Sequence, residues 1–339
     1  MPITLALDAM GGDYGPPVVA PAALALLARH PDLTLILVGQ EEVVRAELAR
    51  RHKGDHPRIV LKHASEVVGM ADPPALAVRV KKDSSMRVAI NLVKSGEANA
   101  CVSAGNTGAL MAIAHFVLKM LPGIERPAIV TSVPNLNGHV HLLDLGANID
   151  CSPQQLLQFA IMGSILVTAT EMKQRPTVGL LNVGTEAIKG NDLIKETSRL
   201  LQGSGLNYVG YVEGDAIYTG KIDIIVCNGF VGNVALKASE GLAQMVSHTL
   251  REAFNRSLFT RLSGLAARPV LTAFRKKVDH RRYNGASLIG LNGTVIKSHG
   301  SADIVAFGYA IEEAISEVMN AVPQHIHKEL APLYERPGL

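Results

Sequence analysis

Tryptophan is absent from this 339-residue sequence, and cysteine and aromatic residues are scarce. Aromatic side chains make up 4% of the chain, too few for the stacking surfaces with which proteins bind single-stranded nucleic acid. We therefore expect no nucleic-acid partner. The three cysteines are far apart and form no C-x-x-C pair, which disfavours both a disulfide framework and a zinc ribbon. With 47% hydrophobic and 19% charged residues, the chain can bury a large core and is not globally disordered.

Two segments bear on where the protein resides in the cell. The first eight residues carry no basic cluster and are typical of a β-strand rather than a signal peptide. Residues 151–170 carry no charge, but Pro153, Gly163 and three glutamines interrupt the apolar run. A membrane span needs about 20 predominantly apolar residues, so we predict a buried or subunit-interface helix here. Together with the unpaired cysteines, these features favour a cytoplasmic protein.

Apolar runs alternate with segments of helical periodicity along nearly the whole chain. The predicted strands cover residues 3–8, 33–38, 58–62, 99–103, 127–133, 139–143, 177–181, 207–212, 222–227 and 287–290. The predicted helices cover residues 17–29, 41–51, 86–95, 107–119, 153–170, 191–202, 233 onward and 302–320. This alternation predicts a three-layer α/β/α fold around a mostly parallel sheet. We expect a single α/β catalytic unit over residues 1–322 and a loosely attached C-terminal tail over residues 323–339.

Loops that combine glycine with Asn or Asp follow most of the predicted strands. They cover residues 8–13, 103–108, 144–148, 182–186, 228–233 and 290–293. Ligands of open α/β sheets bind beyond the carboxyl ends of the strands, where glycine allows close approach and helix N-termini attract anions. Each loop alone is an ordinary turn, but together they predict a polar crevice for an anion. Neither G-x-G-x-x-G nor G-x-x-x-x-G-K-[ST] occurs, which disfavours NAD and ATP, and we expect no cofactor.

Serine and histidine chemistry has little support in the sequence. Ser103 lies outside a G-x-S-x-G motif, so a nucleophilic serine is disfavoured. His139 and His141 alternate along one predicted strand, and His325 and His327 repeat this spacing near the C-terminus. No cysteine or carboxylate stands at a matching spacing, and we therefore predict no metal site.

Two cationic segments suit the binding of phosphate. Lys82 precedes Ser84 and Ser85, which stand where the next helix is predicted to begin. Lys189 stands beside Gly190 at the end of a loop. Lysines, hydroxyl groups and helix N–H groups together bind phosphate, although solvated surface lysines are the alternative interpretation of both segments.

Charge is distributed unevenly along the chain. The net charge is +3, yet residues 251–282 contain nine cations and two acids, a net charge of +7. The other 24 cations and 28 acids sum to −4. Apolar residues recur at helical spacing over the same stretch, and Gly264 and Pro269 predict a bend between two amphipathic helices. We call residues 247–282 the helical arm.

The helical arm has the composition of a docking surface. A basic amphipathic element suits anionic lipid headgroups and equally an acidic carrier protein. Packing against the body of the protein or against a second copy is the alternative. The side chains predicted to make the contact are Leu258, Leu262, Leu271, Phe274, Arg275, Lys276 and Lys277.

Taken together, these motifs resemble those of the bacterial phosphate acyltransferase family. The segments that carry the resemblance run in order over residues 3–320: 8–13, 81–86, 103–111, 143–148, 179–190, 213–214, 227–233 with Lys237, and 283–300. The resemblance implies a fold similar to that of isocitrate and isopropylmalate dehydrogenases. It also implies transfer of a long-chain acyl group from acyl carrier protein to inorganic phosphate, an early step of phospholipid synthesis. One departure is Asn228, where the family more often has Asp.

The resemblance further implies a homodimer that associates peripherally with the inner face of the cytoplasmic membrane. Its acyl phosphate product would pass to a membrane glycerol-3-phosphate acyltransferase. For this chemistry we predict Lys189 as the phosphate-side cation and Asn233 as a positioning or oxyanion donor. The residues predicted to bind substrate or phosphate in support are Lys82, Ser84, Ser85, Asn106, Thr107, His299, Gly11 and Gly12.

Two other functions are open to a chain of this composition. One is an NAD- and metal-dependent 2-hydroxyacid dehydrogenase of the same fold, which requires a nucleotide loop and a cluster of metal-binding Asp residues. The other is a non-catalytic scaffold that binds anions or lipid without turnover.

Overall fold

The computed structural model describes residues 2–51, 56–186 and 188–334, apart from the side chains of residues 275–278, 280 and 331–334. Its centre is one sheet of 11 strands. In chain order they are β1 (Ile3–Asp8), β2 (Leu33–Gly39), β3 (Ile59–His63), β4 (Ala100–Ser103), β5 (Ala128–Asn135), β6 (Gly138–Leu143), β7 (Thr177–Leu181), β8 (Asn207–Val212), β9 (Ile224–Val226), β10 (Ala286–Ile289) and β11 (Thr294–Lys297).

The sheet consists of two parallel halves joined by an antiparallel centre. The strand order is β3-β2-β1-β4-β11-β10-β5-β6-β9-β7-β8. β10 pairs antiparallel with β11 and with β5, and β5 pairs antiparallel with β6. The other pairings within the described chain are parallel. The mostly parallel sheet predicted from the sequence is confirmed, and its two halves run in opposite directions.

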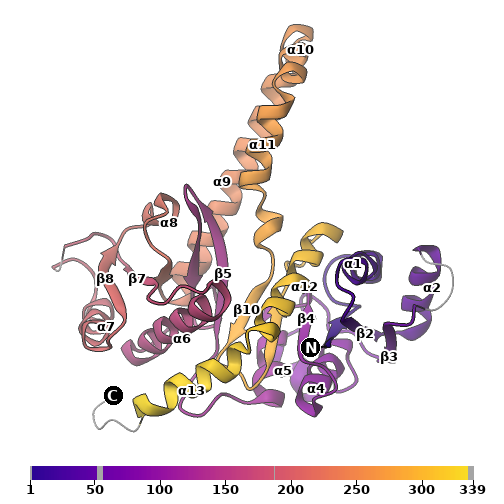
Figure 1. Cartoon of the computed structure of the whole chain (residues 1–339), viewed down its shortest axis with the longest axis horizontal. Helices are drawn as coiled ribbons and strands as arrows, with labels where there is room; N and C mark the ends of the chain where they lie inside the picture. Colours follow the sequence, from indigo (N-terminus) through magenta and orange to yellow (C-terminus); the bar gives the residue numbers. More distant parts are fainter. Residues whose placement is uncertain (1, 52–55, 187, 335–339) are drawn as a thin grey trace.

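Helices cover both faces of this sheet (Figure 1). They are α1 (Pro16–Arg29), α2 (Glu41–Arg51), α3 (Pro74–Arg79), α4 (Ser85–Ser95), α5 (Thr107–Leu118), α6 (Pro153–Glu171), α7 (Asp192–Gly203), α8 (Ala216–Thr219), α9 (Gly229–Asn255), α10 (Leu258–Ala266), α11 (Arg268–Val278), α12 (Ile304–Met319) and α13 (Val322–Tyr334), with a 3₁₀ turn η1 (His280–Tyr283).

Alternation of side chains along the strands separates the core into layers. In β1, Leu5 and Leu7 pack against α1 and α12, whereas Ala6 packs in the cluster that contains residues of α4 and α5. In the other half of the sheet, α6, α7 and α13 contribute to a third cluster around Phe159 and Leu143. The α/β/α layering that the sequence predicted is therefore present.

α6 is the uncharged segment that could be mistaken for a membrane span. It is buried against the sheet, with Leu156 and Phe159 fully enclosed, so the prediction of a core helix is confirmed. None of the helices in the described part of the chain combines the length and apolar character that a membrane crossing requires.

The C-terminal segment differs from the expectation of a loose tail. Val322, Ile326 and Leu330 recur at helical spacing on α13 and are each 1% exposed. They join the core cluster that contains α6, so residues 322–330 are part of the packed body. Sequence analysis missed this helix because its prolines were taken as breakers, yet Pro323 stands in the first turn, where a missing N–H is tolerated.

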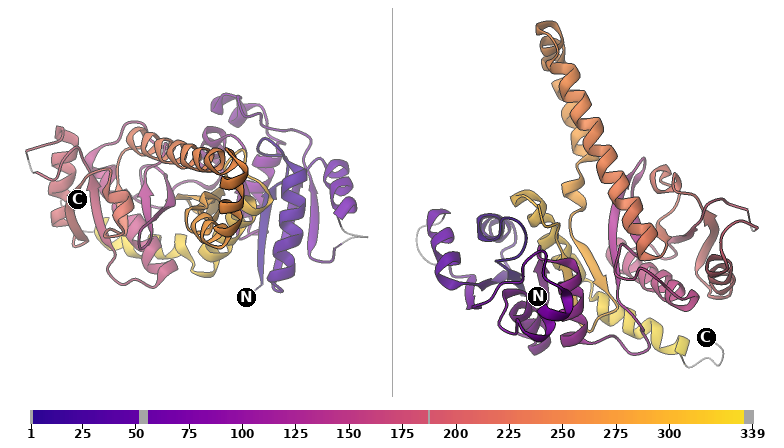
Figure 2. Two further views of the ribbon diagram at one scale, coloured as in Figure 1. Left: turned by 90° about the horizontal axis from the view of Figure 1, so that it is seen from above. Right: turned by 180° about the vertical axis from the view of Figure 1, so that it is seen from behind.

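The helical arm stands out from the body, with α10 at its tip (Figures 1 and 2). Its helices break after Asn255 and after Ala266. Gly264 lies inside α10 rather than at a bend. A Cβ there would approach Phe254 Cδ1 to 2.8 Å, so glycine lets α10 pack closely on α9. Pro269 does mark a boundary, as the second residue of α11. The side chains of Arg275, Lys276 and Lys277 lie outside the described residues.

Candidate active site

Three neighbouring strands, β1, β4 and β11, are parallel and therefore end at the same edge of the sheet. Asp8, at the end of β1, is 1% exposed and accepts a 2.6 Å hydrogen bond from Ser103 Oγ at the end of β4. Burial raises the pKa of Asp8, while hydrogen bonds from Ser103 and Ser85 oppose this effect. The strand ends thus hold a buried carboxyl group in a fixed position.

Lys297, the last residue of β11, places a buried cation at the same edge. Its side chain is 8% exposed, and its Nζ donates hydrogen bonds to the carbonyl oxygens of Ala104 and Ser298. Burial lowers the pKa of Lys297 to about 8, and Asp8 and Asp13 partly offset this effect. A lysine held in this way carries a partly desolvated charge, which attracts anions strongly.

Lys237 of α9 and His299 bring two further basic groups to this position. Lys237 Nζ lies 3.5 Å from His299 Nε2 and also donates to Glu240 Oε2 at 2.8 Å. The His299 backbone N–H donates to Asn284 Oδ1 at 2.8 Å, which fixes the loop. Burial and then the charge of Lys237 lower the pKa of His299. We call Lys237, Lys297 and His299 the basic cluster.

Asn233 lies one helical turn before Lys237, on the same side of α9. Its side chain is exposed and packs over Gly146, where an added Cβ would lie 3.6 Å from Asn233 Cβ. The first turns of α9 therefore join the loop after β6 to the basic cluster. This arrangement brings Asn233 and His299, both predicted from the sequence, to one side of the molecule.

The start of α9 packs tightly on a second buried carboxyl group at a strand end. Asp144, which follows β6, is fully buried and accepts hydrogen bonds from the backbone N–H groups of Ile129 (2.9 Å) and Asn148 (2.6 Å). Its pKa is raised because it is buried. Gly232 is required here, since a Cβ would lie 1.9 Å from the carbonyl oxygen of Asp144.

Asn228 has a structural role in this element. It is the N-cap of α9, and its Oδ1 accepts a 2.9 Å hydrogen bond from the Val231 N–H. Asp and Asn cap helices about equally well. Asn228 therefore provides the helix start that an Asp at this position would also provide.

Lys189 lies on a different loop, after β7. Its Nζ pairs with Glu186 Oε1 at 2.9 Å, and the hydrogen bond with Glu186 raises the pKa of Lys189. Its side chain is 45% exposed. Among the described contacts, none joins Lys189 to Asn233 or to the basic cluster. The structure thus does not bring the two predicted catalytic residues into contact.

The other predicted binding residues fall into two groups. Ser84 and Ser85 are buried, and Ser84 Oγ donates to the Lys81 carbonyl at 2.9 Å. Asn106 caps α5 through Oδ1 and donates from Nδ2 to the Met70 carbonyl. These side chains therefore shape the loops. In the second group, the side chains of Lys82 and Thr107 are exposed. Gly11 and Gly12 lie in the loop after β1.

Burial lowers the pKa of the Lys297 side chain to about 8, yet the sequence analysis did not propose this residue. Strand β11 was not predicted, so the position of Lys297 at a strand end was hidden. The signal was available in the apolar run Thr294–Lys297, followed by Ser298 and Gly300 as a loop. The sequence analysis included Lys237 in a motif but assigned no role to this lysine.

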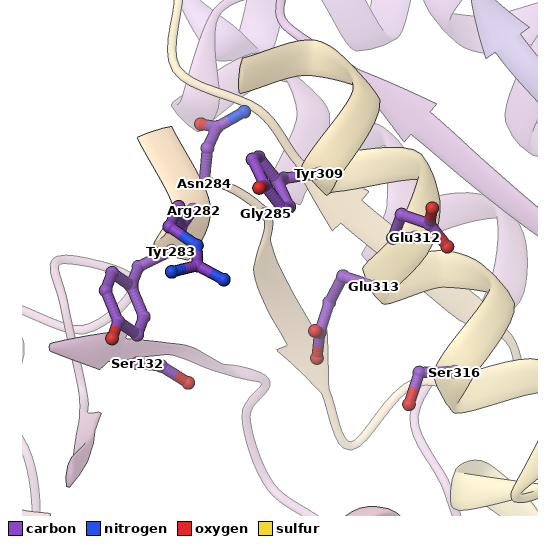
Figure 3. A pocket seen from close by; sticks show the side chains of 9 residues that line it. All are labelled: Ser132, Arg282, Tyr283, Asn284, Gly285, Tyr309, Glu312, Glu313 and Ser316. Atoms are coloured by element: carbon purple, nitrogen blue, oxygen red, sulfur yellow. The ribbon is translucent and has the colours of Figure 1, made fainter. Parts of the chain in front are cut away.

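One cluster of side chains bears on the prediction of no metal site, which stays a prediction. His139, His141 and Glu171 form a cluster able to hold a metal ion. The carboxylate comes from the end of α6, 30 residues beyond His141, so local spacing gave no sign of it. A cavity of about 340 Å³ lies between η1, β5 and α12 (Figure 3). It adjoins the cluster through its lining residue Ser132, whose Oγ lies 3.3 Å from His141 Nδ1. Its lining includes Ser132, Tyr283 and Glu313.

Comparison with known proteins defines the class. The family described as "Fatty acid synthesis protein" matches residues 3–325. A phosphate acyltransferase from Nitrosococcus oceani is 59% identical over 333 residues, which cover 98% of each chain. A phosphate acyltransferase from Methylococcus capsulatus is equally similar. The chain therefore belongs to the bacterial phosphate acyltransferase family and is an acyltransferase.

Solved structures show the same fold at low sequence identity. A phosphotransacetylase from Streptococcus pyogenes matches with a TM-score of 0.64 and 19% identity over 94% of both chains. A 4-hydroxythreonine-4-phosphate dehydrogenase from Klebsiella pneumoniae matches with a TM-score of 0.51 and 15% identity, over 94% of this chain and 98% of that one. The second likeness agrees with the expected dehydrogenase-like fold. The family assignment displaces the dehydrogenase and scaffold alternatives.

Proposed function

We propose that this acyltransferase transfers a long-chain acyl group from acyl carrier protein to inorganic phosphate, and so forms acyl phosphate for phospholipid synthesis. The observation that carries this proposal is the 59% identity to phosphate acyltransferases along almost the whole chain. The basic cluster supports it, because a phosphate dianion requires preorganised cationic and N–H donors.

The reaction needs no covalent enzyme intermediate. A phosphate oxygen attacks the thioester carbonyl carbon, the carbonyl oxygen becomes an oxyanion, and the C–S bond then breaks to release the thiolate, which takes a proton from water. The protein has to position the dianion and stabilise the oxyanion. We assign Lys189 to the phosphate side and the exposed amide of Asn233 to the oxyanion or to positioning. Lys237, next to Asn233 on α9, supplies a second cation for phosphate.

In the basic cluster, His299 and Lys297 have pKa values that suit the binding of phosphate. Burial and the charge of Lys237 lower the pKa of His299, so its ring is neutral at pH 7. A neutral imidazole can donate one hydrogen bond to an anion without adding a charge. Lys297 holds its charge below about pH 8. The cluster therefore loses positive charge, and with it attraction for phosphate, as the pH rises through about 8.

The helical arm supports the proposed partners. Leu258, Phe259 and Leu262 at its tip are 75%, 78% and 60% exposed, and large exposed apolar patches mark interaction sites. Residues 251–282 carry nine cations against two acids. We propose that the protein is cytoplasmic, forms a homodimer, and uses the arm to reach the inner face of the cytoplasmic membrane and acyl carrier protein. Acyl phosphate would be handed there to a membrane glycerol-3-phosphate acyltransferase.

One assay tests the proposed reaction. The purified protein is incubated with long-chain acyl carrier protein and inorganic phosphate, and acyl phosphate is trapped with hydroxylamine as the hydroxamate. A parallel reaction contains acetyl-coenzyme A in place of the acyl carrier protein substrate. We expect phosphate-dependent hydroxamate with the long-chain substrate. Release of free fatty acid independent of phosphate, or turnover of acetyl-coenzyme A alone, would contradict the proposal.

A further inference from the structure

Two histidines and a glutamate meet on the side of β6 away from its carboxyl end. His139 and His141 are two residues apart on β6, so their side chains share one face of the strand. Glu171, the last residue of α6, places Oε1 2.8 Å from His139 Nε2 and 2.5 Å from His141 Nε2. The three ligand atoms lie within 4.8 Å of one another. His141 is three residues from Asp144, about 10 Å along the strand, so this cluster is separate from the loop after β6.

We propose that His139, His141 and Glu171 form a binding site for a divalent transition-metal ion, with Zn²⁺ as the natural candidate. Two imidazole nitrogens and one carboxylate oxygen are a common zinc ligand set, with bonds of about 2.0–2.2 Å. In a tetrahedral site the ligand atoms lie about 3.3 Å apart, so Glu171 has to retreat by less than about 1 Å. Its position at a helix end, with the side chain about one-third exposed, allows that movement.

The surroundings supply the outer shell that such sites need. Ser132 Oγ lies 3.3 Å from His141 Nδ1, so it orients the ring and leaves Nε2 for the metal. The ring centroid of Tyr283 lies 6.1 Å from that of His139, with the two rings tilted by 51°. Ser132 and Tyr283 also line the 340 Å³ cavity, which has room for water as a further ligand (Figure 3).

Charge in this region also favours a cation. Glu313 lines the cavity and interacts electrostatically with both histidines and, unfavourably, with Glu171. Arg282 lines the same cavity and contributes one positive charge. A dication bound by the three ligands would offset the repulsion between the two carboxylates. It would also tie the end of α6 to β6.

The test uses full-length protein without an affinity tag, freed of metal with a chelator and then titrated with Co²⁺ and Zn²⁺. Co²⁺ reports its coordination through visible absorption, and Zn²⁺ affinity follows from competition with a chromophoric chelator. We expect one equivalent of metal per chain. Glu171→Gln and His139→Gln should each weaken Zn²⁺ binding by more than about 100-fold, and Ser132→Ala by about 10-fold.

His248→Gln provides the matched control. His248 and Glu252 form an exposed pair on α9 with Nε2 and Oε1 3.4 Å apart, and no third ligand joins them within the described residues. Wild-type affinity in His248→Gln, together with loss in the two ligand variants, supports the site. Absence of stoichiometric binding in the wild type, or unchanged affinity in either Glu171→Gln or His139→Gln, would overturn it and leave a metal-free hydrogen-bonded cluster. Circular dichroism of each variant confirms that the fold is intact.

Discussion

The strand-end loops and the helical arm arrange their polar and apolar groups in opposite ways. In the loops, charged side chains are buried and hydrogen-bonded, as with Asp8 at 1% and Lys297 at 8% exposure. In the arm, large apolar side chains are exposed, as with Leu258 and Phe259. Buried charge is unfavourable for folding unless it is compensated, and exposed apolar surface is unfavourable in water. Binding of an anion by the loops would offset the cost of buried charge. Binding of an apolar surface by the arm would offset the cost of exposed apolar side chains.

The largest effect is expected from the loop after β7. Lys189→Ala should lower acyl phosphate formation by about 10²–10³-fold, the usual loss when a donor to developing charge is removed. Steady-state kinetics with long-chain acyl carrier protein measures it. Arg199→Ala is the control, because Arg199 forms the same kind of i,i+3 pair, with Glu196, on exposed α7. Near-wild-type turnover in Lys189→Ala would remove this residue from the site and leave Lys237 as the candidate cation.

Truncation of one leucine in the body and one in the arm tests whether these two parts differ in packing. Leu330→Ala on α13 should lower the free energy of unfolding by about 3 kcal/mol, because a fully buried side chain leaves a cavity. Leu262→Ala in the arm, where the side chain is 60% exposed, should change it by less than about 0.5 kcal/mol. Denaturant titration of both variants measures the difference. Equal losses would mean that the arm is packed in solution, as in a dimer.

Charge placed on the apolar side of the arm should weaken membrane binding. Leu271→Glu with Phe274→Glu should reduce sedimentation with anionic vesicles by about 30-fold, since apolar burial is lost and two anions are added near a negative surface. Met172→Glu with Met319→Glu adds the same charge at exposed apolar sites outside the arm. If vesicle binding is unchanged and only the KM for acyl carrier protein rises, the arm docks the carrier protein instead.

The smallest effect concerns the buried lysine. The pKa of Lys297 is about 8 in the folded protein, below its ordinary value, so the unfolded chain binds more protons above pH 8. Stability therefore gains about 1.5 kcal/mol between pH 8 and 9.5 from this group. Lys297→Met should lack that gain when denaturant midpoints are compared across this range. A parallel pH dependence in both proteins would show that Lys297 titrates normally.

The sequence predicted the fold better than it predicted the site. Each of the ten predicted strands is present, because buried parallel strands appear as continuous apolar runs such as Leu33–Gly39. Strand β11 and helix α13 were missed, since β11 has only two apolar residues between Thr294 and Lys297 and α13 contains prolines. Local patterns identified Asn233 and His299 as polar loop or helix-start residues. They did not show that Lys237 reaches His299, because that contact joins residues 62 apart.

Helix α9 links the two regions in a way that bears on the working of the protein. It begins at the cap Asn228, carries Asn233 and Lys237 in its first turns, and continues unbroken to Asn255. At 1.5 Å per residue, the 22 residues from Asn233 to Asn255 span about 33 Å. A tilt of about 5° around its base would displace the far end by about 3 Å. A partner that binds the far end of α9 and tilts the helix would therefore also reorient Asn233, whose amide is proposed to face the thioester.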